Sequence, residues 1–333
     1  AIGGGHGLST MLRGLKQYTE NISAIVTVAD DGGGSGMLRQ DLGMLPPGDI
    51  RNCMEALANT EPLMSELMHY RFPEGVLAGQ SFGNLFLAAL NGISGSFDEA
   101  VSRMSEVLAI TGRVLPVTTA DVQLVAEFEN GASVTGESKI FYCKKREDCR
   151  IRRVRLSPEN PKALPAALAA IREADMIILG PGSLYTSIIP NLLVEGIVEA
   201  IQDSDALKIY VCNVMTQEGE TEGYTVSDHI SALFHHSCRN PFDICLCNSS
   251  PIPKGVAAKY AQEGASPLYA DAGPCAALGV EVISRPIATV DNGFVRHDPG
   301  HLARELILLH AERSVRIAGE HFKPHSYRAE RER

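Results

Sequence analysis

Two kinds of apolar pattern alternate along most of this chain. Short, nearly continuous apolar runs such as Ile22–Ala29, Met176–Leu179 and Ala206–Cys212 are typical of buried strands. Between them, segments such as Ser9–Tyr18 and Asp98–Ala109 repeat apolar residues at helical spacing, which predicts amphipathic helices. Because alternating strands and helices build a parallel sheet covered by helices, the pattern predicts an α/β fold.

The pattern changes in the middle of the chain. Several short strand-like runs follow one another there, and Glu129-Asn130-Gly131 is a hairpin signal between two of them. The runs are Val114–Val117, Val122–Phe128, Val134–Ile140 and Ile151–Leu156. We therefore predict one α/β domain that consists of residues 1–113 and 159–312. An antiparallel β insertion is predicted at 114–158, and a C-terminal tail at 313–333. The basic residues between 141 and 155 are more typical of edge-strand protection than of an anion site.

A glycine-rich loop leads from the first strand into the first helix. Glycines in Gly3–Ser9 allow close backbone approach to a ligand, and free N–H groups at a helix start form an anion site. Our candidate ligand contacts are Gly4, Gly5, Gly7, Leu8 and Ser9. A tight strand-to-helix turn is the plain alternative, because the third glycine of the dinucleotide fingerprint is missing. The missing glycine argues against NAD as the natural ligand, although NAD remains a possible adventitious ligand. Since a two-residue strand is short, we expect residues upstream of Ala1.

A second glycine-rich loop follows the strand that ends at Ala29. Asp30 and Asp31 precede Gly32–Gly36, where Gly34 and Ser35 are further candidate contacts. Two adjacent carboxylates at the end of a parallel strand suit a sugar hydroxyl or Mg²⁺ beside phosphates. The alternative is a solvated loop in which one aspartate caps the next helix.

Further polar residues mark the ends of other predicted strands or the starts of helices. Asp49 is the predicted N-cap of a helix over Ile50–Ala58 and a second candidate metal-binding carboxylate. Because the carboxyl ends of parallel strands share one edge of a sheet, we expect these loops to meet in one crevice. The other candidate contacts are Asn52, Ser81, Asn84, Gly182, Ser183, Thr186, Asn213, Thr216 and Asn248.

Charge and cysteine content narrow the function. The chain has 30 Lys and Arg against 40 Asp and Glu, a net charge of -10, which argues against nucleic-acid binding. No apolar run approaches the length of a membrane span, and no signal peptide is recognisable. We interpret the eight cysteines as buried, reduced thiols of a cytoplasmic protein. None forms a C-x-x-C pair, so we assign no metal ligands, although Cys245 and Cys247 would face the same side of a strand.

Six segments, in this order, give the chain a family resemblance. They are Gly3–Ser9, Val28–Gly36, Pro46–Asn52, Ser81–Leu85, Leu179–Ser187 and Asn213–Gln217. The sequence resembles the YvcK family, or gluconeogenesis factors, in the CofD-like superfamily. The resemblance implies a three-layer α/β/α Rossmann-like fold with a mostly parallel sheet. It also implies a cytoplasmic regulatory protein that binds UDP-N-acetylglucosamine or UDP-glucose and acts in gluconeogenic growth, cell shape and wall-precursor metabolism. Tyr260 and Arg296 match the aromatic and the arginine that such proteins use for the UDP-sugar.

The superfamily also contains enzymes, and this leaves an alternative function. CofD enzymes are 2-phospho-L-lactate transferases that use carboxylates and Mg²⁺. In such a reaction Asp30 or Asp31, together with Asp49, would hold the metal, and Asp31 and Asp49 are the catalytic candidates. Every matched loop has the sequence typical of the YvcK family and not of the CofD enzymes. We therefore favour a binding protein that catalyses no reaction. A dinucleotide oxidoreductase ranks last. Regulatory protein partners and a homodimer are further expectations.

Overall fold

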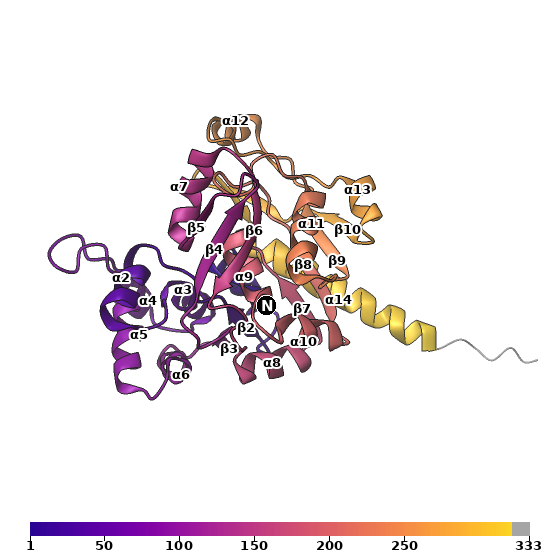
Figure 1. Cartoon of the computed structure of the whole chain (residues 1–333). Helices are drawn as coiled ribbons and strands as arrows, with labels where there is room; N and C mark the ends of the chain where they lie inside the picture. Colours follow the sequence, from indigo (N-terminus) through magenta and orange to yellow (C-terminus); the bar gives the residue numbers. More distant parts are fainter. Residues whose placement is uncertain (322–333) are drawn as a thin grey trace, which may run out of the picture.

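The computed structural model describes the backbone of residues 1–321 and the side chains of residues 1–315 (Figure 1). Its centre is a seven-stranded parallel sheet in the order β10-β9-β8-β7-β1-β2-β3. A three-stranded antiparallel sheet, β5-β4-β6, and a hairpin, β11-β12, accompany it. This confirms the predicted α/β fold with a small antiparallel addition.

The strands are β1 (Ile2–Gly3), β2 (Ser23–Val26), β3 (Arg113–Pro116), β4 (Gln123–Phe128), β5 (Ser133–Thr135), β6 (Ile151–Ser157), β7 (Met176–Leu179), β8 (Leu207–Val211), β9 (Ile244–Asn248), β10 (Glu281–Arg285), β11 (Ala288–Asp291) and β12 (Phe294–His297). The helices are α1 (Gly5–Leu15), α2 (Gly33–Leu42), α3 (Gly48–Leu57), α4 (Pro62–His69), α5 (Phe82–Ile93), α6 (Phe97–Val107), α7 (Glu137–Glu147), α8 (Pro165–Arg172), the π-helical turn η1 (Leu184–Ile188), α9 (Ile189–Leu192), α10 (Ile197–Asp203), α11 (Val226–Ser237), α12 (Lys254–Gln262), α13 (Ala272–Ala277) and α14 (Pro299–His321). None of the helices in the described part of the chain has the length and apolar character needed to cross a membrane.

The strand order creates a switch point at the middle of the sheet. From β1 the chain moves outward through β2 to β3, then returns to β7 on the other side of β1 and continues outward to β10. If only the strands of this sheet are numbered, their order is that of a Rossmann-like fold. The connections after β1 and β7 therefore diverge, and a crevice opens where ligands of such sheets bind.

Apolar strands and capped helices explain the local structure. Strand β7 is buried along nearly its whole length, as its continuous apolar run predicts. Some helices begin at a residue whose side chain accepts a free N–H group of the first turn. Ser81 caps α5 in this way, and Thr225 with Asp228 forms a capping box at α11. Helices α1, α3 and α14 pack together, while α8, α9, α10 and α11 form a second group, which gives the two outer layers.

Two predictions about the insertion are wrong. The run predicted to begin it at Val114 is β3, which pairs in parallel with β2 and forms the edge of the main sheet, so the antiparallel strands begin only with β4. The predicted strand Val134–Ile140 is mostly helix: β5 ends at Thr135 and α7 begins at Glu137. Gly136 has a φ of +110°, which breaks the strand. The Asp31 carboxylate then accepts the N–H of Ser138 in the first turn of α7.

Several boundaries also differ from the predictions. Helix α1 starts at Gly5, four residues before the predicted Ser9, so the glycine loop is itself the first helical turn. Helix α14 continues to His321, whereas we predicted a tail from residue 313. The rest of that predicted tail, 322–333, lies outside the described residues.

Candidate functional site

Two adjoining cavities lie at the switch point of the sheet. One, of about 310 Å³, is lined by the loop after β1, by Asp30 after β2 and by the residues after β7. The other, of about 510 Å³, extends from the same loops to the residues after β8, to α12 and to β12. The two cavities share five residues, so they form one continuous cleft; these are His6, Gly7, Gly182, Ser183 and Gln217. The Ser183 hydroxyl donates to Oε1 of Gln217 at 2.7 Å, which joins the loops after β7 and β8.

The smaller cavity is acidic, and we call it the acidic cavity. Asp30, Asp49 and Glu137 line it and come from three separate segments. The Asp49 carboxylate lies against the glycine loop: a Cβ on Gly4 would lie 2.6 Å from its Oδ2. A glycine is therefore required at position 4 if Asp49 is to keep this place.

Burial and mutual repulsion make these carboxylates weak acids. Burial, followed by the charge of Asp30, raises the pKa of Asp49 to about 7. Burial, followed by the neighbouring carboxylates with Asp30 first, raises the pKa of Glu137 to about 8. The pKa of Asp30 is also raised, mainly by burial, although Oδ1 accepts the Gly32 N–H at 2.9 Å. Such uncompensated negative charge suits a cation or hydroxyl donors better than a bare phosphate.

Glu220 does not line this cavity and is only 2% exposed, but its charge acts on Glu137. Its carboxylate faces the backbone N–H groups at the start of η1, including that of Thr186, and these favour its charged form. Burial still outweighs them and raises the pKa of Glu220 to about 7. Glu220 therefore adds negative potential to the acidic cavity and acts on Glu137.

The larger cavity combines an aromatic ring, a guanidinium and polar loop residues, and we call it the aromatic cavity. Tyr260 projects from α12, and its hydroxyl accepts the Val295 N–H at 3.0 Å. Arg296, next on β12, is exposed in the cleft, with its guanidinium 5.6 Å from the centre of the Phe294 ring. Helices α7 and α12 lie together at the top of Figure 1, and Phe141 of α7 closes this side of the cavity.

His6 lies where the two cavities meet. Its pKa is lowered by burial first and by the positive charge of Arg296 second. His6, the guanidinium of Arg296 and the helix start at Gly5 offer hydrogen-bond donors between the two cavities.

Comparison with known proteins shows the family of the chain. The family model described as 2-phospho-L-lactate transferase CofD matches residues 1–288. The chain belongs to the CofD family. It is 50% identical to the gluconeogenesis factor of Bacillus subtilis, over 92% of this chain and 96% of that protein. It is 48% identical to the gluconeogenesis factor of Halalkalibacterium halodurans, over 92% of this chain and 94% of that protein.

A solved structure gives the same result for the fold. The crystal structure of a UPF0052 family member from Bacillus halodurans superposes with a TM-score of 0.88 at 48% identity, covering 92% of this chain and 98% of that one. The resemblance to gluconeogenesis factors is therefore confirmed, and this CofD-family chain is of the YvcK type.

Twelve of the predicted site residues of this CofD-family chain line the cleft. In the acidic cavity these are Gly4, Gly5, Gly7, Asp30, Asp49, Gly182, Ser183 and Thr186. In the aromatic cavity they are Gly7, Gly182, Ser183, Asn213, Thr216, Tyr260 and Arg296. Several lining residues were not predicted, among them His6, Gln217 and Glu137. His6 and Gln217 sit inside loops that the sequence already singled out, whereas Glu137 lay in a segment predicted as a strand.

Nine predicted site residues lie outside both cavities and have internal roles. Leu8 is fully buried in the core, and the Ser9 hydroxyl donates to the carbonyl oxygen of His6. Asn248 forms a local turn with Ser250. The others are Asp31, Gly34, Ser35, Asn52, Ser81 and Asn84.

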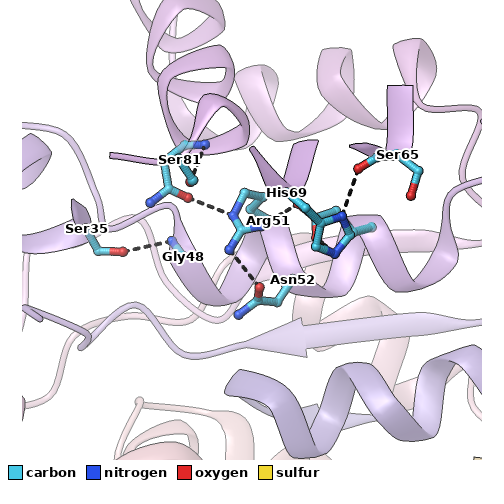
Figure 2. A network of polar contacts seen from close by, with 9 residues as sticks. Ser35, Gly48, Arg51, Asn52, Ser65, His69 and Ser81 are labelled. Atoms are coloured by element: carbon cyan, nitrogen blue, oxygen red, sulfur yellow. Dashed lines mark hydrogen bonds and ion pairs between the residues drawn. The ribbon is translucent and has the colours of Figure 1, made fainter. Parts of the chain in front are cut away.

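Arg51 binds two of these nine residues, Asn52 and Asn84 (Figure 2). This side chain is almost buried and donates to Oδ1 of Asn84 at 2.8 Å and to Oδ1 of Asn52 at 2.9 Å. It also pairs with Glu55. Ser35, nearby, accepts the Gly48 N–H at 3.1 Å. These polar groups hold α2, α3 and α5 together, because a buried guanidinium needs its donors satisfied.

Asp49 does not cap α3 as predicted. The residue before this helix is Pro47, and Asp49 lies within the first turn with its carboxylate directed at Gly4 and Gly5. Its negative charge near the helix start is still favourable. The sequence left open whether Asp49 serves the helix or the site, and the structure places it on the cavity wall.

Asp31 anchors α7 and offers a first test. Its Oδ1 accepts the Ser138 N–H at 2.8 Å, and it does not line the cleft. We expect Asp31→Ala to lower the free energy of unfolding by about 1 kcal/mol, as for loss of a helix cap. Asp31→Asn keeps an acceptor oxygen and should lose less than half of that. Urea unfolding measures both, with the exposed Asp41→Ala as control. Equal losses in the Ala and Asn variants would contradict this role.

A further cavity of about 290 Å³ lies elsewhere. It is lined by Ala1, Ser23 and Met176, at the amino ends of the central strands. Ligands of open parallel sheets bind beyond the carboxyl ends, so we do not assign this cavity to the site.

Proposed function

We propose that this protein binds a nucleotide sugar, UDP-N-acetylglucosamine or UDP-glucose, in the cleft and acts as a regulatory protein. The regulation would concern gluconeogenic growth, cell shape and wall-precursor metabolism, as the family resemblance implies. The observation that supports it best is the division of the cleft. An aromatic cavity with an arginine continues, through a glycine-rich helix start, into an acidic cavity.

This division matches the parts of a nucleotide sugar. The ring of Tyr260 offers a face for the uracil base, and Arg296 can pair with the diphosphate. The N–H groups at the start of α1 supply further donors for phosphate oxygens. The acidic cavity would repel phosphate, but its carboxylates can accept hydrogen bonds from sugar hydroxyls. We therefore propose that the sugar enters the acidic cavity and the base occupies the aromatic one.

Calorimetric titration tests this proposal. We expect UDP-N-acetylglucosamine or UDP-glucose to bind with a Kd well below about 1 mM, a free energy beyond about -4 kcal/mol. GDP and NAD should bind more weakly, since neither combines a uracil with a sugar. Absence of heat for both UDP-sugars at about 1 mM would overturn the proposal.

Two substitutions in the aromatic cavity provide the matched test. Arg296→Ala removes the guanidinium and should weaken UDP-sugar binding at least about tenfold, because charge-assisted hydrogen bonds to phosphate are strong. Tyr260→Ala should have a similar effect, whereas Tyr260→Phe, which keeps the ring, should bind more like the wild type. Arg152→Ala and Tyr18→Ala, both on exposed side chains, are the controls. Unchanged affinity in Arg296→Ala and Tyr260→Ala would place the nucleotide elsewhere.

The acidic cavity favours a second candidate, a Mg²⁺-dependent transferase of the CofD type. Asp30 and Asp49 are the carboxylates that would hold the ion, and Glu137 faces them. In the described part of the chain, no three carboxylate side chains each bring an oxygen within 4.8 Å of the others. This arrangement fits Mg²⁺, which is commonly held by one or two carboxylates together with substrate phosphates. A transferase requires Mg²⁺-dependent product formation that Asp49→Asn abolishes; binding without turnover supports the regulatory protein instead.

The remaining expectations belong to the same proposal. We propose that the protein acts in the cytoplasm, as a homodimer and through regulatory protein partners. Light scattering at several protein concentrations, with and without UDP-sugar, tests the dimer. A constant monomer mass under both conditions would contradict it.

A further inference from the structure

Three cysteine side chains meet inside the protein, away from the cleft. Cys212 follows β8, and Cys245 and Cys247 belong to the adjacent strand β9. All three are at most 1% exposed, and their sulfur atoms lie within 4.8 Å of one another. The sulfur atoms of Cys245 and Cys247 are 3.7 Å apart. We call this group the three-thiol site.

The register of the two strands places these thiols on one face. Tyr210 pairs with Cys245 across parallel strands, and alternate residues on a strand share a face. Helix α11 covers that face, because the Tyr210 hydroxyl lies 3.0 Å from Nδ1 of His229. Figure 1 shows α11 and α13 beside β8 and β9. The three-thiol site is therefore enclosed between sheet and helices.

His229 adds an independent observation. It is fully buried, and its Nε2 has no hydrogen-bond partner in the described part of the chain. A buried polar atom without a partner costs free energy unless something unaccounted for satisfies it, and an ion is one such group. Its Nδ1 contact with Tyr210 is the kind of interaction that orients a metal-binding imidazole.

We propose that the three-thiol site binds one thiophilic metal ion, Zn²⁺ or Cu⁺, through Cys212, Cys245 and Cys247. Zinc–thiolate bonds of about 2.3 Å in a tetrahedron place two sulfur atoms about 3.8 Å apart. The 3.7 Å separation already present matches this geometry. Zn²⁺ would take His229 as a fourth ligand after a shift of the imidazole, which is not within 4.8 Å of all three sulfur atoms. Cu⁺ needs only the three sulfur atoms.

Binding exchanges the protons on the bound thiols for the metal. The protons leave to solvent as the metal–sulfur bonds form. Since the site is enclosed, we expect the metal to enter while the chain folds. Once bound, it would join the ends of β8 and β9, directly before Asn213 and Asn248.

Refolding experiments test the three-thiol site. The whole chain is unfolded with reductant, refolded with Zn²⁺ or with Cu⁺, passed through a chelating column and analysed for metal. We expect about one equivalent for the wild type. Cys212→Ser and Cys247→Ser should retain at least tenfold less metal, whereas Cys53→Ser, equally buried but on α3, should match the wild type. His229→Gln should lose zinc but not copper if His229 is the fourth ligand of Zn²⁺.

Spectroscopy on the wild-type protein gives a test that does not require the variants to fold. X-ray absorption of the loaded protein should show metal–sulfur bonds of about 2.3 Å. A wild-type protein that retains neither metal after the column would overturn the proposal. So would metal bound without sulfur ligands, or retained equally by Cys212→Ser and Cys247→Ser.

Discussion

Gly7→Ala is expected to weaken ligand binding in the cleft strongly. A Cβ at position 7 would lie 2.6 Å from the carbonyl oxygen of Pro181 and 3.0 Å from the backbone nitrogen of Gly182. These are backbone atoms, so no side chain can rotate away, and the loops after β1 and β7 must separate. Overpacking of this kind costs about 1–3 kcal/mol in stability. Because Gly7 and Gly182 line both cavities, we expect UDP-sugar affinity to fall at least about a hundredfold, close to 3 kcal/mol.

Gly92→Ala is the matched control for this substitution. Gly92 also lies within a helix, α5, and a Cβ there meets nothing within 4 Å. We expect unchanged binding and a small gain in stability, since alanine favours helices more than glycine does. Calorimetry measures the affinity and urea unfolding the stability. If the Gly7→Ala variant bound the UDP-sugar as tightly as the Gly92→Ala variant, ligand binding would not require the close approach of the loops after β1 and β7.

Asp49→Asn is expected to stabilise the protein strongly above neutral pH. Burial and the charge of Asp30 raise the pKa of Asp49 from its ordinary 3.8 to about 7. Between these values the folded chain keeps a proton that the unfolded chain has released, so stability falls as the pH rises through this window. Asparagine never ionises, and its oxygen can still accept the Gly5 N–H. At pH 8 we expect the variant to be more stable by about 2–4 kcal/mol. Near pH 4 the two proteins should be equally stable.

Urea unfolding from about pH 4 to pH 8 measures this difference. Comparing the variant with the wild type removes the contribution of the buried histidines, which is equal in both. The difference that is left contains Asp49 and its repulsion of Glu137. Asp41→Asn, on an exposed side chain, is the control and should show no pH-dependent gain. Mg²⁺ should stabilise the wild type at pH 8 more than Asp49→Asn if the ion uses this carboxylate. A constant difference at every pH would show that Asp49 ionises normally in the folded chain.

Much of the fold could be predicted from local patterns. The apolar run Met176–Leu179 became β7 with the same bounds, because a strand buried on both faces has an unambiguous composition. Val114 was assigned to the wrong sheet, since its pattern suits a parallel edge strand as well as an antiparallel one. Helix α7 was missed because its first turn depends on Asp31, a residue far away in the chain.

The candidate site, too, could be predicted only in part from local patterns. Glycine loops after strands reach the switch point in any sheet of this order, so Gly7 and Gly182 could be identified. Ser81 and Asn84 have the same residue types as ligand-binding positions, but they serve the cap of α5 and the partner of Arg51 instead. Local sequence cannot separate these uses, because a hydroxyl or amide binds whichever partner the fold brings near.

The sequence by itself determined the alternation of strands and helices, the glycine loops and the family of this protein. These depend on residue spacing within single segments, which backbone geometry converts directly into structure. Only the tertiary structure decided that Glu137 joins Asp30 and Asp49, and that Cys212 meets Cys245 and Cys247. Both groups combine residues from separate segments, and a spacing rule describes only ligands within one segment. Strand order and register, which follow from packing the whole chain, bring them together.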